Sequence, residues 1–245
     1  MKSENVMDIN FEKIAFLQRE TFISTINHDL KIPVLAQIRA LELLIDEKMG
    51  RLNSGQKEIV NLTLDSCRSM YGMLSEILSA YKYENKDIIL DFEYINIVKF
   101  IEKYFNIPNE VLKNKNIIVE LKNNSCYPII KADKFQLNKA LTYIVDYCIT
   151  NALPNSKLTC YISDFEDNIN ITLSFKSSKS SQEKLNTIFE KFYSNRMDKV
   201  GSNLGIYLAK QIISAHNGFI TGKNNKNQNE YTINLPLTNV NNMQK

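Results

Sequence analysis

Several features are missing from this 245-residue chain, and their absence narrows what it can be. It has no tryptophan and only four cysteines. Cys67, Cys126, Cys148 and Cys160 form no C-x-x-C pair and no metal-ligand spacing, so we expect reduced thiols and no metal centre. No apolar run approaches the roughly 18–20 residues that cross a bilayer. Residues 1–10 do not have the pattern of a signal peptide. These absences predict a cytoplasmic protein without membrane insertion.

A strong charge of either sign is also missing. The formal net charge is +3, and no basic run alternates with aromatic residues, which argues against nucleic acid as a partner. The apolar fraction of 44% and the charged fraction of 23% are ordinary for a globular protein. Since the chain exceeds the usual domain size of about 100–150 residues, we expect two domains, or one domain with a helical extension.

The first half of the chain contains an amphipathic helix, predicted from about Asp8 to Lys48. Its apolar residues recur every three or four positions: Ile23, Ile26, Leu30, Val34, Ile38, Leu41 and Ile45. His28 lies two places from both Ile26 and Leu30, so this stripe predicts that the imidazole faces solvent. An exposed imidazole can attack a phosphoryl group near neutral pH. Pro33 lacks the N–H that the Asp29 carbonyl needs, which predicts a bend just beyond His28.

A second helix follows the turn at residues 49–54, and Ser54 is its expected cap. Its expected stripe consists of Val60, Cys67, Met70, Leu74, Ile77 and Tyr81. Two long helices with a short turn form an antiparallel hairpin, here residues 1–86. A hairpin cannot cover both stripes alone, so we expect a homodimer with a four-helix bundle. A plain coiled-coil spacer would explain the stripes but not the grouping of His28, Asp29 and Pro33.

Residues 87–245 change pattern, and strand-like runs alternate with helical ones. This alternation predicts an α/β sandwich of normal single-domain size, and an α+β class for the whole chain. The expected strands are 88–94, 117–121, 127–131, 158–163, 168–175, 219–221 and 230–235. The expected helices are 96–113, disturbed at Pro108, together with 134–150, 182–193 and 204–216.

The run His28-Asp29-Leu30-Lys31-x-Pro33, with Phe22 six residues upstream, resembles the phosphoacceptor motif of sensor histidine kinases. The resemblance to their transmitter core covers about residues 11–237. It implies a phosphoryl-carrying hairpin, with His28 as the acceptor and Asp29 as the residue that orients and deprotonates it. Lys31 matches a basic position that attracts phosphate oxygens, and Pro33 completes the motif. The second half then implies a GHKL-type ATPase-like domain.

The nucleotide positions depart from the family pattern. The segment 132–137 matches the start of the family's nucleotide helix, yet Tyr147 stands where an asparagine should bind magnesium. Tyr143 replaces a second asparagine, and Asn151 lies one turn, about 5.4 Å, too far along. The stretch 175–179 lacks the expected Asp-x-Gly-x-Gly.

The last glycine box is also incomplete. Gly201 and Gly205 remain as a nucleotide-binding remnant, whereas Asn203 replaces the glycine between them. A helix that starts there could still bind an anion. The segment 188–193 does match the family's aromatic segment, and His216 reads as a structural residue near a helix end. The sequence specifies no cofactor: ATP and Mg²⁺ are the candidates that the resemblance names, and the substitutions argue against them.

Three functions stay open. The favoured one is a two-component relay, in which His28 exchanges a phosphoryl group with an aspartate of a response-regulator receiver domain without ATP-dependent autophosphorylation. Histidine phosphotransferases with a degenerate ATPase-like domain provide a family precedent. The second is an active ATP-dependent histidine kinase with an atypical pocket. The third is a non-catalytic pseudokinase scaffold that sequesters a response regulator. The sequence names neither the regulator nor the signal, and it does not decide between transfer in cis and in trans.

Overall fold

The chain divides into two compact units, Met1–Asn85 and Lys86–Lys245. The structure, a computed structural model, describes residues 2–84, 88–105, 110–177, 187–190, 204–225 and 228–238, and within the first helix it describes side chains from residue 21 on. None of the helices in this described part is both long and apolar enough to span a membrane.

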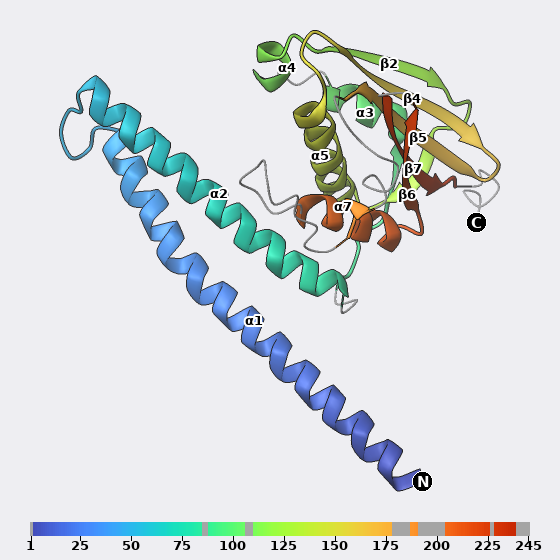
Figure 1. Cartoon of the computed structure of the whole chain (residues 1–245), viewed down its shortest axis with the longest axis horizontal. Helices are drawn as coiled ribbons and strands as arrows, with labels where there is room; N and C mark the ends of the chain where they lie inside the picture. Colours follow the sequence, from blue (N-terminus) through green and yellow to red (C-terminus); the bar gives the residue numbers. More distant parts are fainter. Residues whose placement is uncertain are drawn as a thin grey trace. The chain divides into compact units, whose positions relative to one another are not determined.

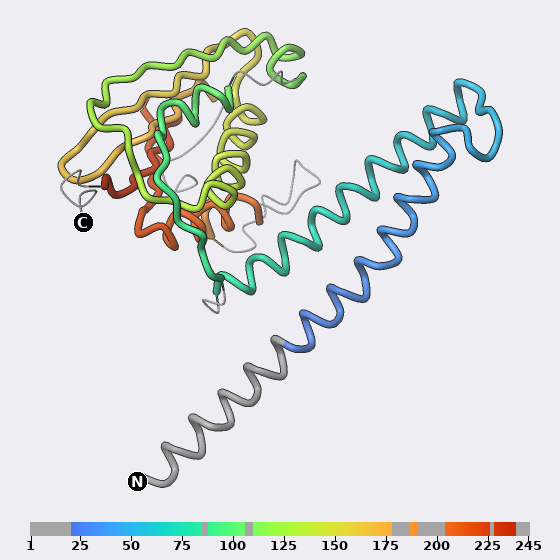
Figure 2. Tube along the Cα trace, turned by 180° about the vertical axis from the view of Figure 1, so that it is seen from behind, coloured from blue at the N-terminus to red at the C-terminus, as the bar shows by residue number. Residues whose placement is uncertain are grey.

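The first unit is a hairpin of two long helices, α1 (Lys2–Ile45) and α2 (Ser54–Glu84). Figures 1 and 2 show the two helices running antiparallel from the turn that joins them. Their shared core contains four buried side chains and four partly buried ones: Val34, Ile38, Leu64 and Cys67, then Leu41, Ile45, Tyr71 and Leu74. The hairpin core is therefore apolar between the turn and Val34, which holds this part of the two helices in register.

The predicted stripe is wrong at two positions of α1 and one of α2. Ile26 and Leu30 are 41% and 48% exposed, whereas Asn27 between them is only 3% exposed. On α2, Met70 is 45% exposed, and Leu64 occupies the core instead. In both helices the pattern of apolar residues is wider than the face that the partner helix covers. The remaining apolar side chains face away from the hairpin core.

The start of α2 differs from the expected Ser54 cap. Asn53 takes that role, since its side-chain Oδ1 accepts a hydrogen bond from the Gln56 backbone N–H at 2.9 Å. In turn, the Asn53 backbone N–H donates a hydrogen bond to the side-chain Oε1 of Gln56, also at 2.9 Å. This reciprocal pair is a capping box, and such caps typically contribute about 1 kcal/mol to helix stability.

The second unit is an α/β sandwich. In chain order its elements are β1 (Glu93–Asn96), α3 (Ile97–Phe105), α4 (Glu110–Asn114), β2 (Ile118–Asn124), β3 (Ile129–Ala132), α5 (Lys134–Asn151), β4 (Lys157–Phe165), β5 (Asn168–Lys176), α7 (Leu204–Ala215), β6 (Phe219–Asn225) and β7 (Gln228–Pro236). One sheet has the strand order β2-β4-β5-β7-β6, and β1 pairs with β3 in a separate two-stranded sheet. Within the five-stranded sheet β2 and β4 are parallel, and the other neighbours are antiparallel.

One face of the five-stranded sheet forms the core of this unit. Ile162, Ile171 and Ile233 pair across β4, β5 and β7, and each is at most 1% exposed. Figure 1 shows α5 and α7 side by side on the same side of the sheet. Their buried side chains cover the apolar strand residues, so burial of this layer stabilises the fold.

Some predicted boundaries were wrong. The strand expected at 88–94 exists only as β1 and begins at Glu93. The helix expected at 96–113 is two helices, α3 and α4, and Pro108 lies outside the described residues. The helix expected at 182–193 also falls largely outside them, with residues 187–190 described. The α+β class and the helical hairpin are confirmed.

Candidate functional site

His28 projects from α1 into solvent. The side chains of His28 and Asp29 are 73% and 68% exposed, and His28 Nδ1 lies 3.3 Å from Asp29 Oδ1. A carboxylate oxygen can only accept, so in the neutral imidazole this contact places the proton on Nδ1 and leaves the lone pair on Nε2. Nε2 is then the nucleophilic nitrogen. An exposed contact of this kind adds little to stability, so its effect is on the orientation of the ring.

Asn27 explains why the next residue faces outward. Its Nδ2 donates to the Leu74 carbonyl oxygen of α2 at 2.5 Å, which turns this position of α1 toward α2. Successive residues on a helix are separated by about 100°, so His28 is carried away from the interface. Asn27 is not part of the predicted apolar stripe, because its side chain is polar. Its spacing of seven and eleven residues to the buried Val34 and Ile38 is the signal that identifies it.

Lys31 and Pro33 lie just beyond His28 on α1. The Lys31 ammonium sits 5.5 Å from the centroid of the Tyr71 ring on α2. Burial lowers the pKa of Lys31, and repulsion from Lys82 lowers it further. Pro33 is exposed, and α1 continues through it as one helix, so the bend expected there stays a prediction. Of the motif residues, Lys31 contacts α2, whereas His28, Asp29 and Pro33 face away from it.

In the second unit, the structure brings Tyr143 and Gly205 into direct contact. A Cβ atom on Gly205 would lie 2.6 Å from Tyr143 Cδ1 and 3.0 Å from Cε1, so only glycine fits beneath this ring. Gly205 is therefore required here by packing between α5 and α7. Gly201, the other glycine of the remnant, lies outside the described residues.

Tyr147, at the position where the family pattern places the magnesium ligand, belongs to an aromatic cluster. Its ring lies 5.8 Å from that of Tyr231, edge to face. Tyr231 is 1% exposed and also contacts the rings of Phe175 and Phe189, at 6.0 Å and 5.9 Å. Burial raises the pKa of Tyr231, so its phenol stays neutral. Asn151 is turned back onto its own helix, because its Nδ2 donates to the Tyr147 carbonyl at 2.8 Å.

These residues do not fit a magnesium–nucleotide complex in the manner of the family. Magnesium needs several oxygen ligands at short, near-octahedral distances. Within the described part of the chain, no three His, Cys, Asp or Glu side chains gather where a metal could bind. Two positions at which the family pattern places nucleotide-site asparagines carry Tyr143 and Tyr147 instead.

His216 is structural, as expected. It is 2% exposed, and its Nε2 accepts from the Asp133 backbone N–H at 2.9 Å. Its Nδ1 lies 2.8 Å from the Ile212 carbonyl oxygen, so Nδ1 carries the proton. The ring also packs edge to face on Phe92, at 5.4 Å. Both ring nitrogens are thus engaged, and His216 is not available for chemistry.

Comparison with known proteins shows what the sequence and fold of this chain resemble. Residues 132–239 match the family described as "Histidine kinase-, DNA gyrase B-, and HSP90-like ATPase". Over 225 residues the chain is 23% identical to the sensor protein kinase WalK of Staphylococcus haemolyticus (strain JCSC1435), an alignment that covers 87% of this chain and 36% of that protein. The chain thus spans about a third of the length of this relative.

Two solved structures share the fold. Full-length ShkA in complex with AMPPNP aligns with a TM-score of 0.78 at 16% identity, over 89% of this chain and 46% of ShkA. The histidine kinase ThkA, solved in complex with the response regulator protein TrrA, aligns with a TM-score of 0.61 at 18% identity, over 90% of this chain and 65% of that one. Both alignments extend beyond the ATPase-like region into the hairpin.

Proposed function

We propose that this chain, which resembles the transmitter core of sensor histidine kinases in having a helical hairpin followed by an ATPase-like domain, acts as a phosphoryl relay in two-component signalling. His28 carries the phosphoryl group and exchanges it with an aspartate of a response-regulator receiver domain. The observation that carries this proposal is the outward imidazole of His28, paired through Nδ1 with Asp29.

The proposed step is a reversible phosphoryl transfer. His28 Nε2 attacks the phosphorus of the receiver's aspartyl phosphate, an N–P bond forms, and the O–P bond breaks to release the carboxylate. Asp29 stabilises the positively charged imidazole ring that results. In the reverse step it keeps the proton on Nδ1, so the ring returns to the same tautomer. Both phosphorylated species are activated, so transfer between them depends mainly on positioning. The group that lies one turn after His28 is the apolar Ile32, which is 57% exposed and cannot orient a water for hydrolysis.

The packing in the second unit favours this relay over an ATP-dependent kinase. Phosphoryl transfer from a nucleotide relies on metal ions and fixed donors to neutralise charge. Here Tyr147 packs on Tyr231 instead of binding a metal, and the Tyr143 ring covers Gly205. We assign residues 87–245 to this ATPase-like domain with a degenerate nucleotide site, and residues 1–86 to dimerisation and phosphotransfer.

The proposed partners are a second copy of the chain and a receiver domain. The hairpin leaves large apolar side chains exposed outside its own core: Phe22, Ile26, Leu30, Leu35, Leu43, Ile59, Leu62 and Met70. An apolar surface of this extent favours association into a four-helix bundle. ThkA, which shares the fold, was solved with a response regulator, and we place the receiver of this protein on the hairpin near His28, in the cytoplasm.

A transfer assay tests the relay. Receiver domains charged with labelled acetyl phosphate are mixed with the wild-type protein, with His28→Gln and with Ser24→Ala, a change at another exposed polar position one turn earlier. We expect acid-labile label on the wild type and on Ser24→Ala, and none on His28→Gln. Label that persists on His28→Gln would refute the assignment of His28.

The same assay separates the alternatives. Transfer of label from γ-labelled ATP to the protein in the presence of Mg²⁺ would support the alternative of an active ATP-dependent histidine kinase. Regulator binding that survives His28→Gln, with no transfer from any receiver to the wild type, would show the scaffold.

A further inference from the structure

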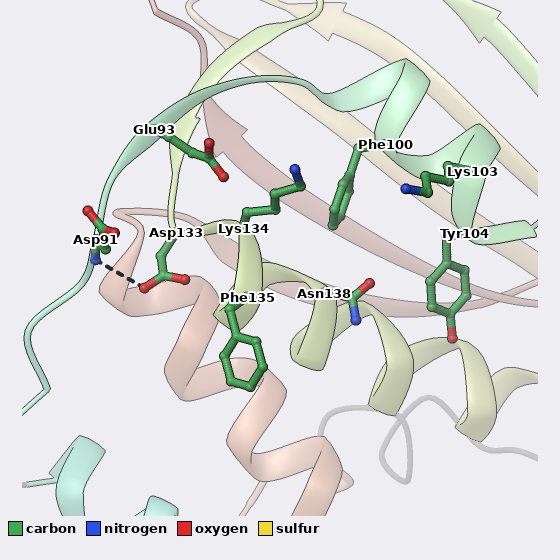
Figure 3. Close-up of a pocket in the computed structure, with 9 residues that line it drawn as sticks. All are labelled: Asp91, Glu93, Phe100, Lys103, Tyr104, Asp133, Lys134, Phe135 and Asn138. Carbon is green, nitrogen blue, oxygen red and sulfur yellow. Dashed lines mark hydrogen bonds between the residues drawn. The ribbon is translucent and has the colours of Figure 1, made fainter.

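We propose that the second unit has a binding site for a small aromatic anion, in a pocket between α3, α5 and the segment that enters β1. Its lining includes neither His28 nor Tyr143 and Tyr147, and the proposal does not depend on the proposed relay. The pocket has a volume of about 550 Å³, within the usual range of roughly 300–1,000 Å³ for small-molecule sites. Figure 3 shows the nine side chains that line it.

Aromatic rings form the walls of this pocket. Phe100 and Tyr104 come from α3, and Phe135 comes from the first turn of α5. Phe135 is 76% exposed, which is unusual for so large an apolar side chain. Burial raises the pKa of Tyr104, so its phenol is neutral. Rings placed in this way favour a planar aromatic ligand, because ring pairs gain energy beyond that of the apolar area they bury.

Four polar side chains of the pocket are available to bind a ligand. Among the described residues, the side chains of Glu93, Lys103, Lys134 and Asn138 have no hydrogen bond or ion pair. Asn138 offers both a donor and an acceptor to the edge of a ring. Asp133 is different, since its carboxylate already accepts bonds from the backbone N–H groups of Gln136 and Asp91, at 3.0 Å each.

The charges of the pocket are divided between its two ends. In Figure 3 the carboxylates of Asp91, Glu93 and Asp133 lie at one end, and the Lys134 side chain extends between Glu93 and Phe100. The Asp133 carboxylate is compensated by its two N–H donors and by the N-terminus of α5. Lys103, at the other end beside Tyr104, has no acidic neighbour among the pocket residues (Figure 3). A ligand that lays its ring against Phe100 and Phe135 can therefore place a carboxylate or phosphate at Lys103.

The absence of tryptophan gives a direct measurement, because an indole ligand is then the only indole in solution. Indole-3-acetate, indole and tryptamine share one ring and carry a negative, zero and positive charge. Ligand fluorescence anisotropy is measured on titration with the full-length protein. We expect saturable binding in the order indole-3-acetate, indole, tryptamine. Failure of all three to bind, or tightest binding of tryptamine, would overturn the proposal.

Two pairs of variants locate the site. Lys103→Glu should weaken indole-3-acetate binding about fivefold and leave indole unchanged, since surface charge pairs are modest in strength. Lys99→Glu, on the same helix outside the pocket, should have no effect. Phe135→Ala should weaken all three ligands, whereas Phe165→Ala, another exposed phenylalanine, should not. Equal effects within either pair would place the binding elsewhere and refute the site. Circular dichroism confirms that each variant is folded.

Discussion

At the scale of single residues, Asn27 is the buried polar side chain next to the proposed phosphoryl carrier. Its Nδ2 donates to Leu74, while its Oδ1 is buried and has no partner within the described part of the chain. A buried acceptor without a partner costs about 1–3 kcal/mol. The hairpin therefore gives up some stability at the position that sets the orientation of His28.

Replacement of Asn27 by leucine tests this cost. Asn27→Leu removes the unpaired oxygen and adds apolar contact with α2, so we expect the free energy of unfolding of the hairpin to rise by about 1 kcal/mol. Ser24→Leu, at an exposed position, should change it little. Urea unfolding followed by helical circular dichroism measures both. A clear loss of stability in Asn27→Leu would mean that the amide is fully satisfied.

The cysteines provide a second test at this scale. Cys148 and Cys160 are fully buried, and burial raises the pKa of Cys160 to about 12 and that of Cys148 well above its usual value of 9.0. Only the thiolate is reactive, so these thiols should resist a disulfide reagent in the folded protein. Cys126 is exposed and should react rapidly. Fast reaction that survives in the double variant Cys67→Ser/Cys126→Ser would contradict the packing of this core.

The raised thiol pKa values also set the direction of a pH effect. Above the ordinary value of 9.0 the thiols of the unfolded chain ionise, whereas Cys148 and Cys160 in the folded protein keep their protons. The unfolded state then binds fewer protons, so stability falls as the pH rises above that value. The urea midpoint should decrease over this range. A midpoint that stays constant or increases would contradict the prediction.

Residue-level predictions succeeded where local pattern decides and failed where tertiary contact decides. The structure confirms that His28 is exposed, but Ile26 and Leu30, the two residues from which its outward face was predicted, are exposed as well. The burial of Asn27 does not follow from hydrophobicity, because its polar side chain is held by one bond to the Leu74 carbonyl. The contact of Tyr143 with Gly205 joins residues on α5 and α7 that are far apart in the sequence, and no local signal predicts it.

At the scale of elements, His216 ties the start of α5 to the end of α7. It accepts from Asp133, the cap of α5, and bonds to Ile212 in the last turn of α7. We expect His216→Ala to lower the free energy of unfolding by about 2–4 kcal/mol, because it leaves the buried Asp133 N–H unpaired and opens a cavity.

The control for this change is a histidine of the other unit. His28→Ala, on the exposed face of α1, should leave stability within about 0.5 kcal/mol. Thermal unfolding of both variants supplies the comparison. An effect of His216→Ala as small as that of His28→Ala would show that the two bonds do not join the helices.

Element types were predictable, and some element ends were not. The 3.6-residue pattern identified α1, α2, α5 and α7. The apolar run that begins at Ile88 suggested a strand, yet only its end pairs, as β1 with β3. Ile89, in the unpaired part, is 96% exposed and does not pack against the core of the unit. Pairing partners decide where a strand begins, and a single stretch of sequence does not contain them.

At the scale of the whole molecule, the spacing of apolar residues marks the boundary between the two units in the sequence. The spacing is helical throughout the hairpin, whereas strand-like and helical runs alternate in the sandwich. The alternation of strands and helices predicted the sandwich. The parallel pair β2–β4 inside an otherwise antiparallel sheet was not predictable in this way, because parallel partners are connected by a long crossover, here through β3 and α5. The residues proposed for function follow the same division. The proposed phosphoryl carrier His28 lies on the hairpin, and in the sandwich Tyr143 packs on Gly205 and Tyr147 on Tyr231.

The most direct test of the relay starts from the phosphorylated protein. The chain has only two histidines, and phosphoramidate should modify the exposed His28 and not the buried His216. Transfer from this loaded protein to a panel of receiver domains is then followed by ³¹P NMR and peptide mass spectrometry. We predict phosphate on His28 that moves to the aspartate of a receiver faster than it is lost to water. Phosphate on His28 that passes to no receiver, or modification of the folded protein at His216, would contradict the account.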